Sequence, residues 1–340
     1  MKYRQLADTG VFVSELCLGA MTFGGKGQIW ENIGGLDQAA ADGIVHRALD
    51  AGINFIDTAD VYSAGASETM VGTAIAGRRH DLVIATKVRG RMGQEPNQVG
   101  LSRLHIMNSV EASLKRLNTD YIDLYQIHRT DWLTNIEDTL RALDDLVRAG
   151  KVRYIGCSNL PAWYLMKSLA VSREQHIERF RCTQSFYSLA GRDLERETIP
   201  LLKDQGLGLL VWSPLAGGFL SGKFTRDSGD DTARRAKFDF PPIDKDKGFA
   251  ILDVLGPIAK AHGATVPQIA LAWILANDAV TSVIIGARKI AQLDDNLKSI
   301  DVTLTAGDLK ALDEVSKLTP EYPAWMDVLG SDRKPGERRY

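Results

Sequence analysis

Short runs of almost entirely apolar residues alternate along the chain with longer stretches in which apolar and polar positions follow a helical period. Runs that are apolar nearly throughout are typical of strands buried on both faces of a parallel sheet. We predict strands over residues 16–19, 54–57, 82–88, 122–128, 152–158, 181–187, 207–213 and 281–286.

The intervening stretches repeat their apolar positions every three to four residues, as amphipathic helices do. We predict helices over residues 37–51, 67–76, 103–117, 136–149, 162–170, 193–205, 248–262 and 267–276, and one more in the tail over 305–318. Eight strands, each followed by helical sequence over about 270 residues, fit a (β/α)8 TIM barrel of typically ~250 residues better than an open Rossmann sheet. Residues 4–13 predict a short hairpin ahead of the barrel. No linker interrupts the pattern, so we expect a single domain over 1–340 in the α/β class.

Composition removes several classes of function. The 340 residues are 44% hydrophobic and 25% charged with a formal net charge of -2, which leaves no basic footprint for nucleic acid or an anionic membrane. The apolar run 269–276 is far shorter than the roughly 20 residues of a membrane span, and the N-terminus lacks a secretory apolar region, so a soluble cytoplasmic protein is expected. Cys17, Cys157 and Cys182 lie far apart in predicted strands, which favours buried thiols over disulfides or a metal site.

Ionisable residues end three adjacent predicted strands. In a TIM barrel the active site lies at the C-terminal ends of the strands. Asp57, Lys87 and His128 end the second, third and fourth strands, and Tyr62 follows in the loop after the second. Because charged residues in buried strands are rarely without a partner, we expect these four side chains to meet in one pocket.

Together the four side chains would make a proton donor. A phenol with a pKa near ~10 is a poor acid at neutral pH, but a nearby ammonium stabilises the phenolate and lowers that pKa. Lys87 can therefore activate Tyr62, and Asp57 can neutralise the buried lysine. His128 can hydrogen-bond the oxygen that Tyr62 protonates.

Seven motifs now carry a resemblance to a known family. The segments are GINFIDTADVYSAGASE, IATK, LYQIH, GKVRYIGCSN, TQSFYS, VWSPLAGGFLSGK and IIGARKIAQLDDN. In order and spacing the chain resembles the aldo-keto reductase superfamily from about residue 3 to 318. The resemblance implies a TIM barrel that binds NADPH in extended form and transfers hydride to a carbonyl of a small-molecule substrate. It also implies that Asp57, Tyr62, Lys87 and His128 are catalytic, with Tyr62 as general acid in reduction.

The nicotinamide end of the cofactor is expected near strands five to seven. Ser158, Asn159 and Gln184 offer hydroxyl and amide groups that can orient a carboxamide. Trp212 resembles the aromatic residue of the bacterial and potassium-channel β-subunit branch, where it stacks on the nicotinamide.

The phosphates are expected at the last two strands. The loop after Trp212 supplies closely spaced backbone amides for a pyrophosphate, with Lys223 as a counter-charge. Arg288 can pair with a 2′-phosphate at the start of the last helix, and Gln292, Asp295 and Asn296 can reach ribose and adenine. The resemblance adds a basic clamp from the loop 216–247, for which Arg234 and Arg235 are adjacent candidates. The full predicted cofactor set is Gly19, Met21, Asp57, Ser158, Asn159, Gln184, Trp212, Ser213, Pro214, Leu215, Gly217, Lys223, Arg234, Gly286, Arg288, Gln292, Asp295 and Asn296.

The substrate pocket is expected to come from variable loops. Phe23, Trp30, Arg129 and Trp132 are the candidates, with Trp325 of the tail as a further one, and they suggest a bulky, partly apolar carbonyl compound. Ala20 and Met21 stand where the family often has Thr and Trp. Two alternatives remain open: a cofactor-binding regulatory subunit with slow turnover, and a Schiff-base aldolase using Lys87. The sequence leaves open whether the protein is a monomer or a homo-oligomer.

Overall fold

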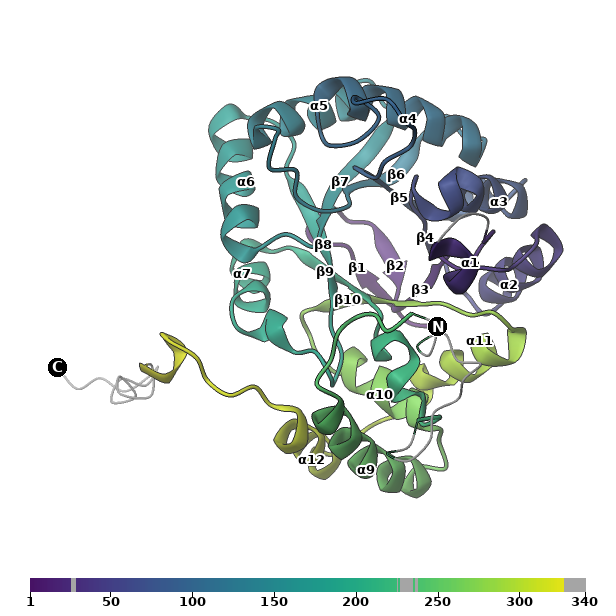
Figure 1. Ribbon diagram of the computed structural model, residues 1–340, viewed down its shortest axis with the longest axis vertical. Coiled ribbons are helices and arrows are strands. Elements are labelled where there is room, and N and C mark those ends of the chain that lie inside the picture. Colours follow the sequence, from purple (N-terminus) through teal and green to yellow (C-terminus); the bar gives the residue numbers. More distant parts are fainter. Residues whose placement is uncertain (26–28, 225, 227–234, 236–237, 327–340) are drawn as a thin grey trace.

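Eight parallel strands close into a barrel in the computed structural model, which describes residues 1–25, 29–224, 226, 235 and 238–326. Around the barrel the strand order is β10-β3-β4-β5-β6-β7-β8-β9. Figure 1 shows the strands at the centre with helices around them. The fold is thus the predicted (β/α)8 TIM barrel. The strands are β3 (Leu16–Gly19), β4 (Phe55–Asp57), β5 (Val83–Val88), β6 (Ile122–Ile127), β7 (Val152–Ser158), β8 (Phe180–Phe186), β9 (Gly208–Trp212) and β10 (Val280–Ile285).

Several helices of the barrel begin at a side chain that accepts a hydrogen bond from the first turn. Asp37, Ser102 and Asn135 cap α2, α4 and α5 in this way. The described helices are α1 (Ile29–Ile33), α2 (Gln38–Asp50), α3 (Ala66–Ala74), α4 (Arg103–Leu117), α5 (Ile136–Arg148), α6 (Ala162–Gln175), α7 (Thr198–Gln205), α9 (Lys245–Ala261), α10 (Val266–Leu275), α11 (Ile290–Leu297) and α12 (Ala306–Ser316).

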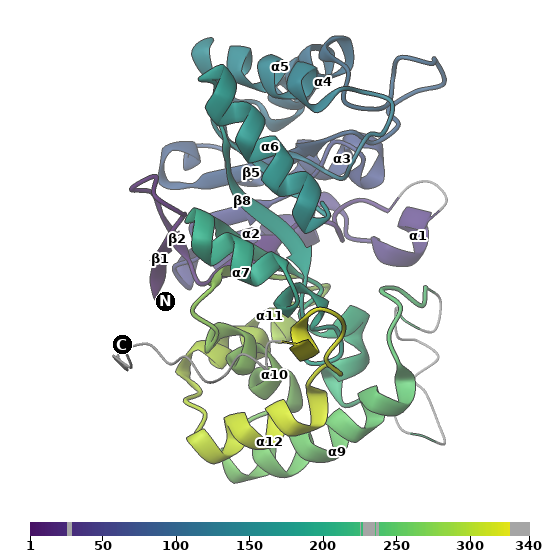
Figure 2. The ribbon, with the colours of Figure 1, turned by 90° about the vertical axis from the view of Figure 1, so that its left-hand side faces the viewer.

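A hairpin of β1 (Tyr3–Gln5) and β2 (Phe12–Ser14) lies at the N-terminal end of the barrel, as predicted. Its fully buried Leu6 and Val13 join Phe55, Ala85 and other side chains of the barrel interior in one apolar cluster. Figure 2 shows the hairpin and α1 at opposite ends of the molecule. Apolar side chains therefore fill the barrel at the N-terminal ends of its strands. The C-terminal ends are where a polar active site is expected.

Predicted and observed elements differ mainly at their ends. The predicted helix 193–205 is divided into a 3₁₀ turn (Asp193–Glu195) and α7, because Pro200 lacks an N–H and is tolerated only in the first turn of a helix. The predicted helix 162–170 is too short, since α6 continues to Gln175 before His176 adopts a left-handed conformation. The short α1 was not predicted.

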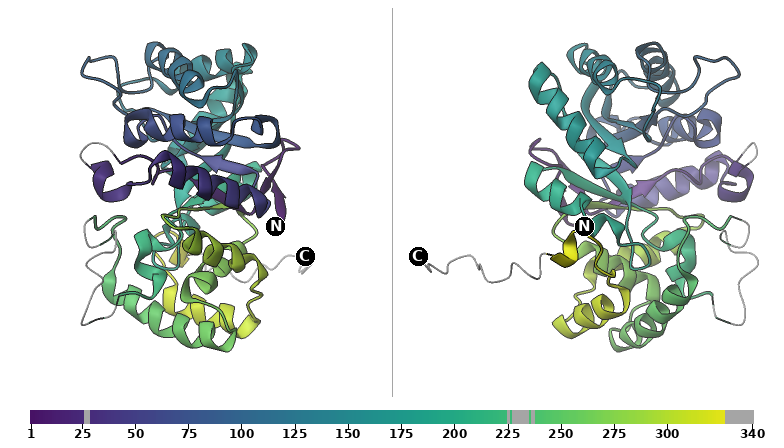
Figure 3. Two further views of the ribbon diagram at one scale, coloured as in Figure 1. Left: turned by 90° about the vertical axis from the view of Figure 1, so that its right-hand side faces the viewer. Right: turned by 60° about the vertical axis from the view of Figure 1, so that its left-hand side comes forward.

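Residues 317–326, beyond α12, leave the helical layer and run outward (Figures 1 and 3). Trp325 packs on Tyr322 with ring centroids 5.9 Å apart, and both rings are largely exposed. Among the described residues, no helix is long and apolar enough to cross a membrane.

Candidate active site

The predicted catalytic residues converge at the C-terminal ends of β4, β5 and β6. Lys87 Nζ donates to Asp57 Oδ1 at 2.5 Å, to the Thr58 carbonyl at 2.9 Å and to Tyr62 Oη at 3.3 Å. Adjacent parallel strands bring the lysine and the aspartate to the same rim, and Tyr62 begins the 3₁₀ turn that follows β4. Lys87 is fully buried, while Asp57 and Tyr62 are only 2% and 8% exposed.

Asp57 also accepts two hydrogen bonds from side-chain amides, both at its second carboxylate oxygen. Gln126 Nε2 on β6 lies 3.1 Å from Asp57 Oδ2, and Gln184 Nε2 on β8 lies 2.7 Å from the same oxygen. Gln126 was missed from the sequence, although a fully buried amide inside an apolar strand was a usable signal. The carboxylate thus joins four strands of the barrel.

Lys87 is held as an ammonium. Burial lowers its pKa, but the charge of Asp57 and the nearby Tyr62 oxygen together outweigh burial, so the pKa of Lys87 is raised above its usual value. A charged lysine can donate to the tyrosine oxygen and stabilise its phenolate form. It cannot act as the free amine that Schiff-base chemistry requires.

The ring of His128 is nearly perpendicular to the phenol of Tyr62. Its ring centroid lies 5.7 Å from that of Tyr62 with an interplanar angle of 77°. Burial, followed by the charges of Lys87, Arg129 and Arg89, lowers the pKa of His128 well below its usual range. The imidazole is therefore neutral at physiological pH and can orient a polar group without adding a charge.

The residues expected at the nicotinamide are connected to one another and to His128. Asn159 Nδ2 donates to Ser158 Oγ at 2.8 Å and to the carbonyl of His128 at 3.1 Å. Ser158 Oγ donates to the carbonyl of Gln184 at 2.8 Å, and Trp212 Nε1 donates to Asn159 Oδ1 at 3.0 Å. These contacts bring the ends of β6, β7, β8 and β9 together.

The indole of Trp212 stacks on Phe240 from the following loop. The two rings are nearly parallel, with centroids 5.7 Å apart, and Phe186 lies 5.2 Å away at a tilt. A nicotinamide on the face covered by Phe240 would have to displace that ring. Stacking of the cofactor on Trp212 remains a prediction.

The loop after β9 forms a tight turn, η4 (Ala216–Ser221), ahead of Lys223. Ser213 Oγ accepts from the Gly217 N–H at 2.8 Å, and Gly217 and Gly218 have φ of 66° and 95°. A Cβ at Gly217 would lie 2.3 Å from the Phe240 carbonyl oxygen, so this close approach requires glycine. The N–H groups of Gly217 and Gly218 are used within the turn, by Ser213 Oγ and the Leu215 carbonyl, so the exposed Lys223 beside it is the group that can meet an anion. Pro214, which is buried, and Leu215, which is half-buried, come directly before this turn.

The end of β10 places Arg288 against α1. Its Nη2 donates to the Ile33 carbonyl at 2.9 Å, while its backbone N–H donates to Gln292 Oε1 at 2.9 Å. Gly286 is exposed next to the strand. The guanidinium of Arg288 and the ammonium of Lys223, at neighbouring strand ends, match the positive charges that a 2′-phosphate and a pyrophosphate need. The donor set therefore fits a phosphorylated dinucleotide.

Other predicted cofactor residues have structural contacts. Asp295 accepts from Thr265 Oγ1 at 3.0 Å and from Gln268 Nε2 at 2.8 Å, and Asn296 is buried. Arg235 is buried as well, donating to the carbonyl oxygens of Ala216 and Pro241 and pairing with Asp239. Arg234 lies outside the described residues. At β3, a Cβ on Gly19 would lie 2.7 Å from Ile284 Cγ2, and Met21 is half-buried.

The predicted substrate residues occupy different environments. Trp30 on α1 packs on Tyr62 with centroids 5.4 Å apart, and Arg129 is exposed beside His128. Trp132 is 64% exposed and stacks on Trp163 at 6.2 Å. Phe23 is fully buried in the hydrophobic core, so its ring offers no exposed surface to a substrate.

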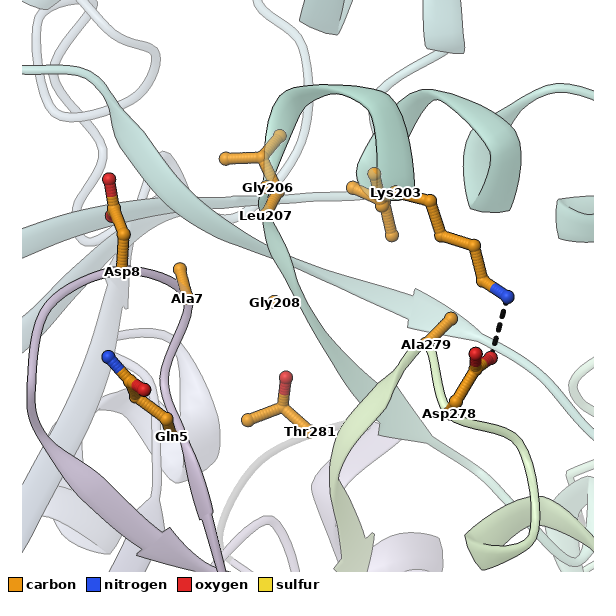
Figure 4. Close-up of a pocket in the computed structure, with 11 residues that line it drawn as sticks. Gln5, Ala7, Asp8, Lys203, Gly206, Leu207, Gly208, Asp278, Ala279 and Thr281 are labelled. Atoms are coloured by element: carbon orange, nitrogen blue, oxygen red, sulfur yellow. Dashed lines mark ion pairs between the residues drawn. The ribbon is translucent and has the colours of Figure 1, made fainter.

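A pocket of about 500 Å³ lies at the other end of the barrel. Gly208 at the start of β9 and Thr281 near the start of β10 line it, and Lys203 and Asp278 form an ion pair of 2.6 Å at its edge (Figure 4). In this fold the N-terminal face serves stability, and Asp57, Tyr62, Lys87 and His128 do not line this pocket. In the described part of the chain, no cluster of three or more His, Cys, Asp or Glu side chains could hold a metal ion.

Comparison with known proteins agrees with this geometry. The aldo/keto reductase family matches residues 15–317. The chain is 38% identical over 341 residues to the uncharacterized oxidoreductase YrpG of Bacillus subtilis, spanning 96% of this chain and 100% of that one. It is 35% identical over 334 residues to a probable voltage-gated potassium channel subunit beta of Arabidopsis thaliana, spanning 95% and 99% of the two chains. It is 34% identical over 332 residues to norsolorinic acid reductase B of Aspergillus parasiticus, spanning 95% and 86%. The chain therefore belongs to the aldo/keto reductase family.

Proposed function

We propose that the protein is an NADPH-dependent reductase that converts an aldehyde or ketone to an alcohol. The observation that carries the proposal is the buried chain of contacts from Asp57 through the Lys87 ammonium to the hydroxyl of Tyr62. A phenol beside a permanently charged ammonium is suited to give a proton to a developing alkoxide.

Each residue of the site has one task in this scheme. Tyr62 donates its proton from Oη to the carbonyl oxygen of the substrate, and the charge of Lys87 stabilises the phenolate left behind. Asp57 keeps Lys87 charged and in place. The neutral His128 orients the substrate oxygen by hydrogen bonding. Trp30 covers Tyr62 and limits the access of water.

The cofactor would be held along the ends of β7 to β10. Ser158, Asn159 and Gln184 would bind the carboxamide, the turn after Trp212 with Lys223 would bind the pyrophosphate, and Arg288 would bind the 2′-phosphate. When bound, the cofactor supplies the hydride that is added to the carbonyl carbon.

A second candidate is a cofactor-binding regulatory subunit with slow turnover. It is favoured by the similarity to a protein named as a probable potassium channel subunit beta. The complete set of Asp57, Tyr62, Lys87 and His128 favours the reductase. The raised pKa of Lys87 disfavours a Schiff-base aldolase.

A panel of carbonyl compounds tests the proposal. NADPH oxidation is followed with aliphatic aldehydes, aryl aldehydes, keto-sugars and ketosteroid-like compounds, and we expect multiple turnovers with at least one bulky class. Single-turnover hydride transfer from bound NADPH separates the two candidates. Rapid transfer followed by multiple turnovers supports the reductase, whereas slow transfer without turnover supports the regulatory subunit.

A further inference from the structure

Two arginines flank the catalytic histidine at the mouth of the barrel. Arg89 follows β5 directly, and Arg129 follows His128 after β6. The backbone N–H of His128 donates to the Val88 carbonyl at 2.9 Å, and Arg89 Nε donates to the Thr130 carbonyl at 3.3 Å. The two adjacent strand ends therefore bring Arg89 and Arg129 to the same part of the barrel rim.

Neither guanidinium forms an ion pair within 4.0 Å in the described part of the chain, and Arg129 is exposed. The nearby carboxylate of Asp131 acts to raise the pKa of Arg89, so it offsets one of the two positive charges. It also accepts from the Leu101 N–H at 2.7 Å, the Thr134 hydroxyl at 2.7 Å and the Leu133 N–H at 3.2 Å. Burial and the charge of Arg129 lower the pKa of Arg89, which agrees with two like charges in proximity. The site thus carries an excess of positive charge beside its proton donor.

The backbone at Arg89 also indicates a functional position. Its φ is 128°, a conformation that is sterically costly for any residue with a side chain. Such conformations persist where the surrounding structure enforces them, and they concentrate at active sites and ligand clamps.

The phosphates of a cofactor do not account for these charges. Their predicted donors lie at the ends of β9 and β10, on the opposite side of the closed barrel from β5 and β6. In Figure 1, β5 and β6 lie in the upper half of the barrel and β9 and β10 in the lower half. A ligand that uses Arg89 and Arg129 must therefore approach from the substrate side.

We propose that Arg89 and Arg129 form a subsite for an oxyanion group, a carboxylate or a phosphate, on the carbonyl substrate. The inference rests on the proposed function and adds that the substrate is an anionic aldehyde or ketone. Guanidinium groups bind such groups through charge-assisted and often bidentate hydrogen bonds. Trp132, three residues beyond Arg129 in the same loop, is 64% exposed and offers an aromatic surface to the apolar part of the substrate.

Three para-substituted aldehydes of similar size test the proposal: 4-carboxybenzaldehyde, 4-formylphenyl phosphate and the neutral methyl 4-formylbenzoate. The readout is the ratio of kcat/KM for each anion to that for the ester, so that a general loss of activity cancels. We expect a wild-type ratio above one for at least one anion, and the larger ratio identifies the group. In Arg89→Gln with Arg129→Gln, this ratio should fall by about 10- to 100-fold.

The matched control is Arg103→Gln, which removes one positive charge from an exposed ion pair with Asp145 at the start of α4. This control should leave the ratio unchanged. A wild-type preference for the ester, or a double variant with the wild-type ratio, overturns the proposal.

Calorimetric titration with benzoate and phenyl phosphate measures binding of these anions to the same site without requiring turnover. Binding that is lost in the double variant supports the subsite even if no aldehyde is reduced, in which case the proposed reductase function fails and the subsite stands. Equal binding by the wild type and the double variant, or no binding by either, overturns the subsite.

Discussion

Tyr62 is the residue on which the proposed chemistry depends most directly. Its hydroxyl lies 3.3 Å from Lys87 Nζ, and its ring packs between Trp30 and His128. These neighbours fix the phenol at the mouth of the barrel while leaving 8% of the residue exposed.

Tyr62→Phe should lower carbonyl reduction by about 100- to 10,000-fold, because it removes the general acid but keeps the ring. Cofactor binding, measured by quenching of tryptophan fluorescence, should stay within about threefold of wild type. A variant that keeps more than about a third of the wild-type activity would show that another group donates the proton.

Asp60 lies in the loop between β4 and Tyr62 and has an unusual environment. It is fully buried, and neither carboxyl oxygen has a hydrogen-bond partner among the described residues. Burial and the charge of Glu68 raise the pKa of Asp60 to about 8, although the nearby Val61 N–H, Arg116 and Lys87 act in the opposite direction. Arg116 already pairs with Glu68 at 2.6 Å. Asp60 is therefore protonated in the folded protein at neutral pH.

This proton makes folding stability depend on pH. The unfolded Asp60 has a pKa of about 3.9, so between about pH 4 and pH 8 the folded state binds more protons than the unfolded state, and stability falls as pH rises. The loss should be on the order of 5 kcal/mol over that window. Asp60→Asn carries no such proton and should unfold with a shallower pH dependence.

Urea unfolding at pH 5 and pH 8.5 measures how the free energy of unfolding of the wild type and of Asp60→Asn changes with pH. Asp120 is exposed, so Asp120→Asn serves as the control. Parallel pH profiles for the wild type and Asp60→Asn would mean that Asp60 is ionised in the folded state.

At the scale of elements, the buried carboxylate of Asp57 joins β4 to β5, β6 and β8. Its partners are Lys87, Gln126 and Gln184, one from each of the other strands. A parallel barrel pairs only neighbouring strands by backbone hydrogen bonds. These side-chain contacts therefore add links across the barrel mouth, where apolar packing gives way to the active site.

Lys87→Met should break this arrangement. The variant leaves Asp57 as an unpaired buried carboxylate, which typically costs about 3–5 kcal/mol of unfolding free energy. The apparent pKa of the catalytic acid should rise, because no ammonium remains to stabilise the phenolate.

Urea denaturation and the pH profile of kcat/KM report the two effects of Lys87→Met separately. Adding Asp57→Asn should restore part of the stability but not the activity. An unchanged pH profile would contradict the role given to Lys87.

At the scale of the whole molecule, the site depends on closure of the barrel. Arg288 follows the last strand, yet its guanidinium donates to the Ile33 carbonyl of α1, which follows the first strand of the barrel. The parallel pairing of β10 with β3 brings these distant segments together. The expected 2′-phosphate site therefore lies next to the helix that covers Tyr62.

Arg288→Ala should weaken NADPH binding by roughly 10- to 150-fold and change NADH binding little, because only NADPH carries the 2′-phosphate. Lys289 is adjacent to Arg288 and exposed, so Lys289→Ala serves as the comparison and should weaken NADPH binding less. Fluorescence titration with both cofactors measures the preference. An equal loss of affinity for NADPH and NADH would instead show that the main role of Arg288 is to hold α1 in place.

The sequence alone determined the fold and indicated which ionisable residues would meet at the mouth of the barrel. Near-continuous apolar strands alternating with amphipathic helices admit few architectures, so the eight barrel strands were predicted to within a residue at most ends. Asp57, Lys87 and His128 were recognisable because an ionisable group at the end of a buried strand must have a partner. These signals are local, since each is carried by side-chain type and by position within one strand.

Tertiary structure decided what each side chain meets. The sequence did not show that Gln126 binds Asp57, that Arg235 is buried on backbone carbonyls, or that Phe240 stacks on Trp212. It did not show that Asp60 is left without a hydrogen-bond partner or that Arg89 and Arg129 face the same histidine. Each of these facts depends on distances between loops from different strands, which closure of the barrel sets. The charge state of a buried group follows from the same distances, because burial and neighbouring charges determine its pKa.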